Sequence, residues 1–409
     1  MSVRRWLCFA LLLSVTADKS NCATAAGAFP ARAWPPDDPA LIAFGRLLFY
    51  DPALSLNNSL ACAGCHVQAL AFTDGRRVAR GATGALHRRN TPALANTAYV
   101  SSLGWSDPLQ WQLEVQHRVP LFGHAPVEMG LKDPLPRGLR ERLRSEPRYV
   151  QAWAALRARS KDLPAALSRA VQPVEADTLV LAIAAFVRSL VSNDAPFDAW
   201  LYRDAKQALS ADARSGFALF NSPRLACGEC HRGFLLGGSV RTLKRQQVPE
   251  FFNTGVGGPG VGGPGVGRGP QRDRGLAAHT GRADDVGKFR TPSLRNVALT
   301  APYMHDGSMP DLDAVLDHYS RGGAPRAEKS RREQSRGEKA RAENAPGENA
   351  GGNNANAAPA AQLRGFTLTR EERTQVIAFL NALTDQRFVT APEYADPWVQ
   401  PAPPAAAVR

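Results

Sequence analysis

The sequence contains two Cys-x-x-Cys-His segments, Cys62–His66 and Cys227–His231. This pattern is typical of c-type haem attachment, in which the two thiols form thioethers to the porphyrin and the adjacent histidine reaches the iron. The sequence therefore predicts two covalent haems, attached through Cys62, Cys65 and His66 and through Cys227, Cys230 and His231.

Two other uses of these four cysteines stay open at this point, namely two disulfides or one four-cysteine zinc site. Neither explains why a histidine directly follows both pairs, and zinc ligand pairs seldom lie so far apart in a sequence. The remaining cysteines, Cys8 and Cys22, lie in an N-terminal segment that we expect the mature chain to lose.

The N-terminus predicts an export signal over residues 1–25. Two arginines precede the apolar stretch Trp6–Val15, and a small-residue cleavage site ends at Ala25. Cys22 would be the acceptor of a lipid anchor, but the three residues before it lack the apolar residue that such a signal needs. We therefore expect a periplasmic protein, and because no other long apolar run follows, no membrane span in the mature chain.

Length suggests two domains. The net charge would permit nucleic-acid binding, but its position in the chain favours a solvated insertion instead. The 409 residues carry a formal net charge of +13, but much of the excess lies in an Arg-, Glu- and Asn-rich stretch, Arg321–Gln362. That stretch has almost no large apolar residue, so we expect a disordered insertion over residues 321–362. Gly255–Gly269 is a short Gly/Pro/Val repeat and is expected to be a loop.

The apolar pattern predicts a mainly α fold made of two haem domains, residues 26–200 and 201–409, joined by long loops. Thr178–Val191 is almost wholly apolar and predicts a buried helix. Ser210 is expected to cap a helix that leads to the second haem site, and Thr369 begins a capping box before an amphipathic helix through Leu383. No convincing strand pattern occurs.

Several motifs around both attachment sites resemble the bacterial di-haem cytochrome c peroxidases and MauG. They occur in order over nearly the whole mature chain except the two low-complexity segments, as Phe44–Pro52 (FGRLLFYDP), Ala71–Gly75 (AFTDG), Arg89–Leu94 (RNTPAL) and Phe289–Gly307 (FRTPSLRNVALTAPYMHDG). The resemblance implies two cytochrome c-like domains and a peroxide-dependent oxidoreductase.

In that family, the iron ligand opposite the second histidine distinguishes two groups of enzymes. Peroxidases use methionine at this position, and MauG uses tyrosine. The family position, nineteen residues after the threonine of T-A-P-Y (here Thr300), falls on Tyr319. An anionic phenolate stabilises ferric and more oxidised iron, whereas a thioether favours ferrous iron. The alternative is that Tyr319 only packs and that Met304 or Met309 is the ligand.

The resemblance makes the first haem the site of the peroxide reaction. Family peroxidases carry a displaceable histidine on the loop after the first attachment site, but Gly75–Ala85 contains none, so we expect an open iron. His87 is the alternative ligand. Gln116 is expected to hold peroxide, and Glu128 to move a proton between its oxygens. The segment between these two carries two extra residues, so His124 is a further candidate for this pocket.

The family also places a tryptophan between its haems and a calcium ion between its domains. Trp105 falls near that tryptophan position as an electron relay, with Trp111 as the rival. The calcium ligands would be the Asn90 side chain and the carbonyls of Thr300 and Pro302.

The sequences of Leu86–Pro92 and Val119–Gly130 most resemble those of the MbnH-type branch. Enzymes of that branch use hydrogen peroxide to form a high-valent di-haem state that oxidises tryptophan in a partner protein. One alternative is a cytochrome c peroxidase that takes electrons from a small cytochrome or copper protein. The other is a non-catalytic di-haem electron carrier with both irons six-coordinate.

Overall fold

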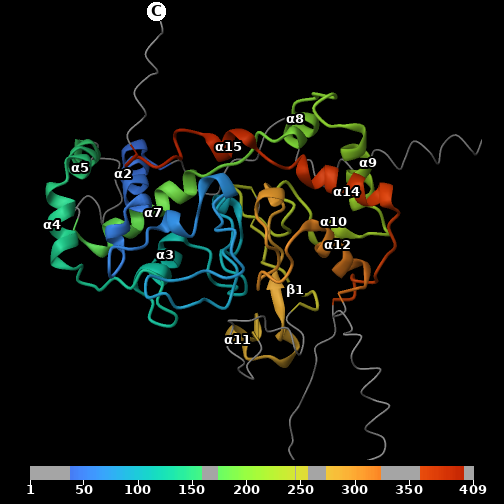
Figure 1. Ribbon diagram of the computed structural model, residues 1–409, viewed down its shortest axis with the longest axis horizontal. Helices are drawn as coiled ribbons and strands as arrows, with labels where there is room; N and C mark the ends of the chain where they lie inside the picture. The colour runs from blue at the N-terminus through green and yellow to red at the C-terminus, as the bar shows by residue number, and fades with distance from the viewer. Residues whose placement is uncertain (1–36, 159–173, 245, 257–272, 324–359, 400–409) are drawn as a thin grey trace, which may run out of the picture.

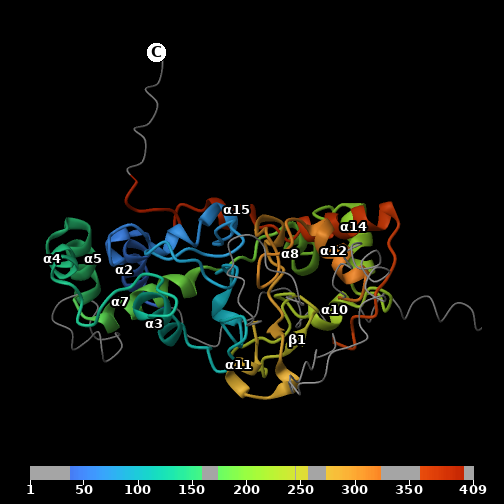
Figure 2. The same ribbon diagram turned by 60° about the horizontal axis from the view of Figure 1, so that its bottom comes forward.

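The computed structural model describes residues 37–158, 174–244, 246–256, 273–323 and 360–399. The expected signal peptide, including Cys22, and most of both low-complexity segments lie outside these residues. The described chain forms two helical lobes side by side, and both views separate α2, α3, α4, α5 and α7 from α9, α10, α12 and α14 (Figures 1 and 2). The mainly α fold is thereby confirmed.

The first lobe is built around two helices, α2 (Pro39–Tyr50) and α7 (Ala176–Ser189). Asp38 caps α2 by accepting a hydrogen bond from the Ala40 N–H at 2.8 Å. The two helices pack closely at Gly45, where an added Cβ would lie 1.8 Å from the Ala182 carbonyl oxygen. The helix predicted over Thr178–Val191 is thus confirmed, with bounds two residues earlier.

The second lobe repeats this arrangement with α9 (Ala211–Phe220) and α14 (Arg370–Asn381). Both predicted caps are confirmed. The Ser210 Oγ accepts from Ala213 N at 3.1 Å, and Thr369 and Glu372 exchange the two bonds of a capping box. The helices meet at Gly216, where a Cβ would lie 1.9 Å from the Gln375 carbonyl oxygen.

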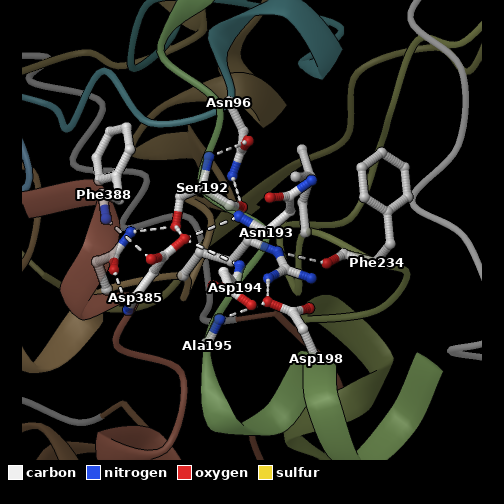
Figure 3. A network of polar contacts seen from close by, with 12 residues as sticks. Asn96, Ser192, Asn193, Asp194, Ala195, Asp198, Phe234, Asp385 and Phe388 are labelled. Atoms are coloured by element: carbon white, nitrogen blue, oxygen red, sulfur yellow. Dashed lines mark hydrogen bonds and ion pairs between the residues drawn. The ribbon is translucent and has the colours of Figure 1, made fainter. Parts of the chain in front are cut away.

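A buried polar network joins the lobes (Figure 3). Asn96 and Asn296 both adopt the left-handed conformation, with φ of 62° and 61°. The Asn96 side chain accepts from Ser192 N, which follows α7, and Asn296 accepts from Asp385 N, which follows α14. Because Asp385 Oδ2 in turn accepts from the Ser192 hydroxyl at 3.1 Å, the ends of the two central helices are bonded to each other.

The predicted domain boundary at residue 200 would assign two segments to the wrong lobe. One segment before it packs in the second lobe, and one segment after it packs on the first. Phe197 of α8 (Pro196–Tyr202) lies in the second core, against Phe217 and Phe379. After α14 the chain crosses back, and α15 (Gln386–Thr390) lies over the first lobe (Figure 1), where Phe388 contacts Phe72. Sequence periodicity carries no information about such crossings.

The described residues include one small sheet that the sequence did not predict. The strands β1 (Phe251–Asn253) and β2 (Lys288–Arg290) pair antiparallel, with Phe252 opposite Phe289. Three-residue strands are too short to produce a recognisable alternation of apolar and polar residues. The sheet lies between the lobes (Figure 1).

The remaining described helices have at most 12 residues. No helix in the described ranges is long and apolar enough to cross a membrane. The other elements are η1 (Pro52–Leu54), η2 (Cys62–Gly64), η3 (Gln68–Leu70), η4 (Thr97–Tyr99), α3 (Leu113–Phe122), α4 (Arg137–Ser145), α5 (Pro147–Ala158), α10 (Cys227–Cys230), α11 (Ala277–Thr280), η6 (Ala283–Asp285), η7 (Val297–Leu299) and α12 (Leu312–Ser320).

Candidate haem sites and peroxide pocket

The two cysteine pairs lie on equivalent short helical turns, η2 in the first lobe and α10 in the second. All four thiols are free. Among the described residues, no group of three or more His, Cys, Asp or Glu side chains could hold a metal ion, so the four-cysteine zinc alternative is wrong. The disulfide alternative is wrong as well, because no thiol is bonded to another. Each cysteine pair is therefore available for haem attachment beside its own histidine.

Both histidines are held in the tautomer that an iron ligand requires. His66 Nδ1 lies 2.8 Å from the Phe72 carbonyl oxygen, and His231 Nδ1 lies 2.9 Å from that of Leu236. Because a carbonyl can only accept, each Nδ1 carries the proton and each Nε2 keeps its lone pair. Burial lowers the pKa of both rings, which keeps them neutral. Thiols and a free imidazole nitrogen thus meet the needs of covalent haem at both sites.

One large cavity contains the second attachment site, and Tyr319 of α12 lines it together with Cys227, Cys230 and His231. Burial, with smaller contributions from the two thiols, raises the pKa of the Tyr319 phenol. Met304 also lines this cavity, whereas Met309 is not among the lining residues and pairs its backbone with Tyr303. The structure thus brings Tyr319 to the second haem site and leaves Met304 as its nearer rival.

The charge of this cavity suits an anionic cofactor such as haem, which carries two propionates. Arg290 lines the cavity and donates only to backbone oxygens, those of Gly104 and Thr291, each at 3.1 Å. Burial lowers the pKa of Arg290 to about 10, so the guanidinium stays charged at neutral pH. Glu229 is the one carboxylate among the described lining residues. A cation with no carboxylate partner in a buried cavity fits a propionate.

The predicted relay and calcium residues lie in the same cavity. Trp105 lines it and donates its indole N–H to the Asn90 carbonyl at 2.9 Å. The Asn90 side chain uses its amide nitrogen to bond the Arg76 carbonyl at 2.8 Å, which leaves its amide oxygen to face elsewhere. Thr300 and Pro302 are lining residues too. All three residues of the predicted calcium site therefore line this one cavity.

Trp111, the rival relay, lies apart from this cavity's lining residues. Its ring is covered by the Arg241 guanidinium, whose central carbon is 3.9 Å from the ring centroid. A cation over an indole makes removal of an electron from that ring harder. This geometry favours Trp105 over Trp111 as the relay.

Helix α3 lies near the first attachment site, because its His117 interacts electrostatically with His66. Gln116 lies half-buried on it, and the next residue, His117, is 9% exposed. The Nδ1 of His117 lies 2.7 Å from the Leu113 carbonyl oxygen, which again leaves Nε2 free. Burial lowers the pKa of His117 to about 4, and the nearby His66 adds to this shift. The helix with Gln116 therefore lies beside the first attachment site.

Glu128 is fixed against the same site by its neighbours. Met129 N donates to the Pro120 carbonyl at the end of α3, and the Glu128 carbonyl accepts from Ala82 N at 2.7 Å. Burial raises the pKa of Glu128 to about 7. Burial is also the main cause of the raised pKa of Cys62 and Cys65, and the Glu128 charge adds to both shifts. The carboxyl thus lies close to the predicted peroxide-reacting haem.

The two histidines left open by the sequence take different positions. His87 Nδ1 lies 3.8 Å from Glu128 Oε1, and its side chain is 13% exposed. His124 is exposed to solvent. The structure thus brings His87, and not His124, to the carboxyl of the first pocket.

Sequence reasoning assigned no role to His117 or Arg290. The signal for His117 was its helical spacing, since it shares a face of α3 with Leu113 and Leu121, all three buried. Arg290 gave no such signal, because an arginine is ordinarily solvated, and only the structure shows that this one lines the cavity.

Comparison with known proteins supports the resemblance seen in the motifs. A family model described as di-haem cytochrome c peroxidase matches residues 39–206. The methylamine utilization protein MauG of Methylorubrum extorquens is 30% identical over 88% of this chain and 82% of its own. The cytochrome-c peroxidase IdrP1 of Denitromonas iodatirespirans is 34% identical over 74% of this chain and 79% of its own.

A solved structure of a MauG-like protein associated with microbial copper homeostasis is 35% identical, with a TM-score of 0.73. The match covers 91% of this chain and 97% of that one.

Proposed function

Because the chain belongs to the di-haem cytochrome c peroxidase and MauG family of peroxide-dependent oxidoreductases, we propose that it uses hydrogen peroxide to oxidise tryptophan in a partner protein, as the MbnH-type branch does. The observation that carries this proposal is the position of Tyr319 in the cavity of the second attachment site. A phenolate ligand suits a haem that stores an oxidising equivalent. The similarity to a MauG-like protein associated with copper homeostasis supports the choice of branch.

Two haems held at these sites would supply the redox chemistry of the peroxide reaction, and the chain's own side chains direct that reaction. The amide of Gln116 orients bound peroxide by hydrogen bonds. Glu128, with its pKa raised to about 7 by burial, takes the proton from the inner oxygen and returns it to the outer one, so that water leaves. Trp105 passes an electron between the two sites, and its N–H bond to Asn90 holds its ring in place.

Calcium and location complete the proposal. The oxygen of the Asn90 side chain and the carbonyls of Thr300 and Pro302 would bind one calcium ion, since hard cations prefer oxygen donors. Asn90 comes from the first lobe and the other two from the second, so the ion would brace the contact between the lobes. The export signal predicted over residues 1–25 supports a periplasmic enzyme and a periplasmic protein substrate.

A cytochrome c peroxidase is the second candidate, favoured by the relatives that carry that name. Such an enzyme would draw its electrons from a small cytochrome or copper protein. Met304, which shares the cavity with Tyr319, would be its second ligand. The two functions therefore differ in one ligand atom and in the electron donor.

Low-temperature EPR of the oxidised protein, before and after one equivalent of hydrogen peroxide, tests the proposal. We expect one high-spin and one low-spin ferric signal. Both should be lost on addition of peroxide and return slowly when no donor is present. Two low-spin signals, or activity that needs prior reduction by a small cytochrome, would favour the peroxidase.

A further inference from the structure

Two neighbouring surface segments carry the most exposed large apolar residues of the described chain. Leu109 and Val248 are each 82% exposed, and Leu243 is 68% exposed. Single exposed apolar residues are common on any protein surface, but several on adjoining segments typically mark an interaction site. Leu109 belongs to a loop, residues 101–111, and the other two belong to residues 239–248.

The two segments are bonded to each other. The Ser101 hydroxyl donates to the Ser239 carbonyl at 3.2 Å, and Arg241 N donates to the Tyr99 carbonyl at 2.7 Å. The Arg241 guanidinium covers the ring of Trp111. Tryptophan and arginine are enriched among the residues that contribute most to binding at protein interfaces. We call the three exposed apolar residues, with Trp111 and Arg241, the junction patch, because the two halves of the chain each supply one of its segments.

The first segment also forms part of the haem cavity. Leu103 and Trp105 line that cavity, and Leu103 N donates to the Gln110 carbonyl at 2.7 Å, which closes the loop that presents Leu109. The patch therefore lies on the outside of the loop that holds the proposed relay, Trp105. In the proposed function, electrons leave an indole of the partner protein and reduce the oxidised state that peroxide generates. Because electron transfer slows steeply with distance, a partner bound at this loop would be well placed to use the relay.

The charge of the two segments indicates the chemistry of the partner. Residues 239–248 contain three basic residues and no acidic one, and Lys244 is exposed. The one acidic residue of the first segment, Asp107, accepts from Leu109 N at 2.9 Å and lies 3.8 Å from His279, so its carboxylate already has partners. A second copy of this chain would bring the same positive charge to a two-fold contact, whereas an acidic surface would be attracted.

We infer that the junction patch is the docking site for the proposed partner protein, which presents an acidic, partly apolar surface around the tryptophan that is oxidised. This inference rests on the proposed function, because it places the partner beside Trp105. The exposed apolar residues are buried against the partner. Lys244 attracts its carboxylates, which mainly raises the rate of association.

Two short synthetic peptides test this site on the haem-loaded protein. Each has one tryptophan and one leucine, with glutamate at the remaining positions of the first and lysine at those of the second. Hydrogen peroxide is added first, and stopped-flow absorbance then follows the return of the ferric spectrum after mixing with peptide. For the wild type we expect the acidic peptide to react faster than the basic one, with an advantage that added salt removes.

Substitutions in the patch should slow this reaction. Leu109→Ser and Val248→Ser should each lower the rate with the acidic peptide by about 3- to 10-fold, because a buried apolar contact is lost. Lys244→Gln should make the rates with the two peptides more alike. Val150→Ser is the matched control, since Val150 is 46% exposed on α5, at the far end of the first lobe (Figure 1). Its rates should equal those of the wild type, and all four variants should keep the wild-type ferric EPR spectrum.

Other outcomes would overturn the docking site. Equal wild-type rates with the two peptides would do so, as would a rate with the acidic peptide that Leu109→Ser and Val248→Ser leave unchanged. A wild-type dimer in sedimentation velocity that Leu109→Ser makes monomeric would assign the patch to a second copy of the chain. A clear fall in the unfolding temperature of Leu109→Ser would show that another segment of this chain covers the patch. Ferric signals that do not respond to peroxide, before any peptide is added, would instead refute the proposed function, and this inference with it.

Discussion

Three histidines share one hydrogen-bonding pattern but differ in what their second ring nitrogen can do. His66, His231 and His117 each place Nδ1 within hydrogen-bond distance of a backbone carbonyl. Two of the three directly follow a haem-attachment cysteine, and their free Nε2 is accounted for by iron. The third lies on α3 and stays neutral because its site is buried. A neutral buried histidine should then affect how the protein responds to acid.

The first prediction concerns that response. The pKa of His117 is about 4 in the folded protein and about 6.5 in the unfolded chain, so the unfolded state binds the extra proton between these values. Stability should therefore fall as pH drops from 6.5 to 4, by about 3 kcal/mol at 1.36 kcal/mol per pKa unit. In His117→Gln this loss should disappear, as measured by urea unfolding at pH 4 and pH 7. An equal acid sensitivity in His117→Gln and in His124→Gln would contradict it.

The second prediction concerns the ligand at the second haem. Tyr319→Phe keeps the ring and removes the oxygen, so the low-spin ferric EPR signal should become high-spin. Mass spectrometry should show that both haems stay attached. Tyr303→Phe is the matched control. Tyr303 lines the same cavity but donates its hydroxyl to the Val297 carbonyl at 3.0 Å, so its loss should cost about 1 kcal/mol and leave the spectrum unchanged. Loss of the low-spin signal in Met304→Leu instead would assign the ligand to methionine.

At the scale of elements, each lobe depends on one glycine at a helix crossing. A Cβ at Gly45 or Gly216 would collide with a backbone carbonyl, which cannot rotate away as a side chain can. We predict that Gly45→Ala and Gly216→Ala each lower the free energy of unfolding by about 1–3 kcal/mol. The matched control is Gly138→Ala in α4, where nothing lies within 4 Å and helix propensity should add about 0.5–1 kcal/mol. Thermal unfolding measures all three, and a neutral Gly45→Ala would contradict close packing.

The elements also show how far local sequence signals reach. The caps at Ser210 and Thr369 were predicted correctly, because a hydroxyl that accepts from an N–H three residues later is a local interaction. The two Cys-x-x-Cys-His segments were equally easy to recognise, since the covalent chemistry of haem attachment fixes the spacing of their residues. The strands β1 and β2 were missed because their pairing joins residues almost forty positions apart through only three residues each. Periodicity cannot reveal a pairing of that kind.

At the scale of the whole molecule, the sequence could not show which parts of the two lobes touch. The crossing of α15 onto the first lobe depends on contacts such as the Gln68 side-chain amide with the Ala391 carbonyl at 2.9 Å. Nor could it show that His87 faces Glu128, because the two residues approach only when the loop at Gly81 packs against Val127. The resemblance correctly identified the family, yet such long-range contacts decide which side chains share a pocket.

The contact between the lobes gives the last prediction. Asp385 is 2% exposed, and one of its oxygens, Oδ2, accepts from Asn193 N at 3.0 Å and Asp194 N at 2.9 Å, besides the Ser192 hydroxyl (Figure 3). Asp385→Ala would leave the buried Ser192 hydroxyl without its acceptor, at about 1–3 kcal/mol, and would remove the acceptor that fixes the N–H groups of the exposed residues Asn193 and Asp194. We therefore expect Asp385→Ala to lower the unfolding temperature and to split one thermal transition into two, one for each lobe.

The comparison of two milder substitutions shows whether this bond network, and not charge alone, couples the lobes. Asp385→Asn keeps one accepting oxygen, so its unfolding temperature should lie between those of Asp385→Ala and the wild type. Asp212→Asn changes the same charge at an exposed position on α9 and should cost only a few tenths of a kcal/mol. The ferric EPR signals of all three proteins should be unchanged, because Asp385 is not among the described residues that line the second haem cavity. A single cooperative transition in Asp385→Ala would mean that the packing of α8 and α15 alone holds the lobes together.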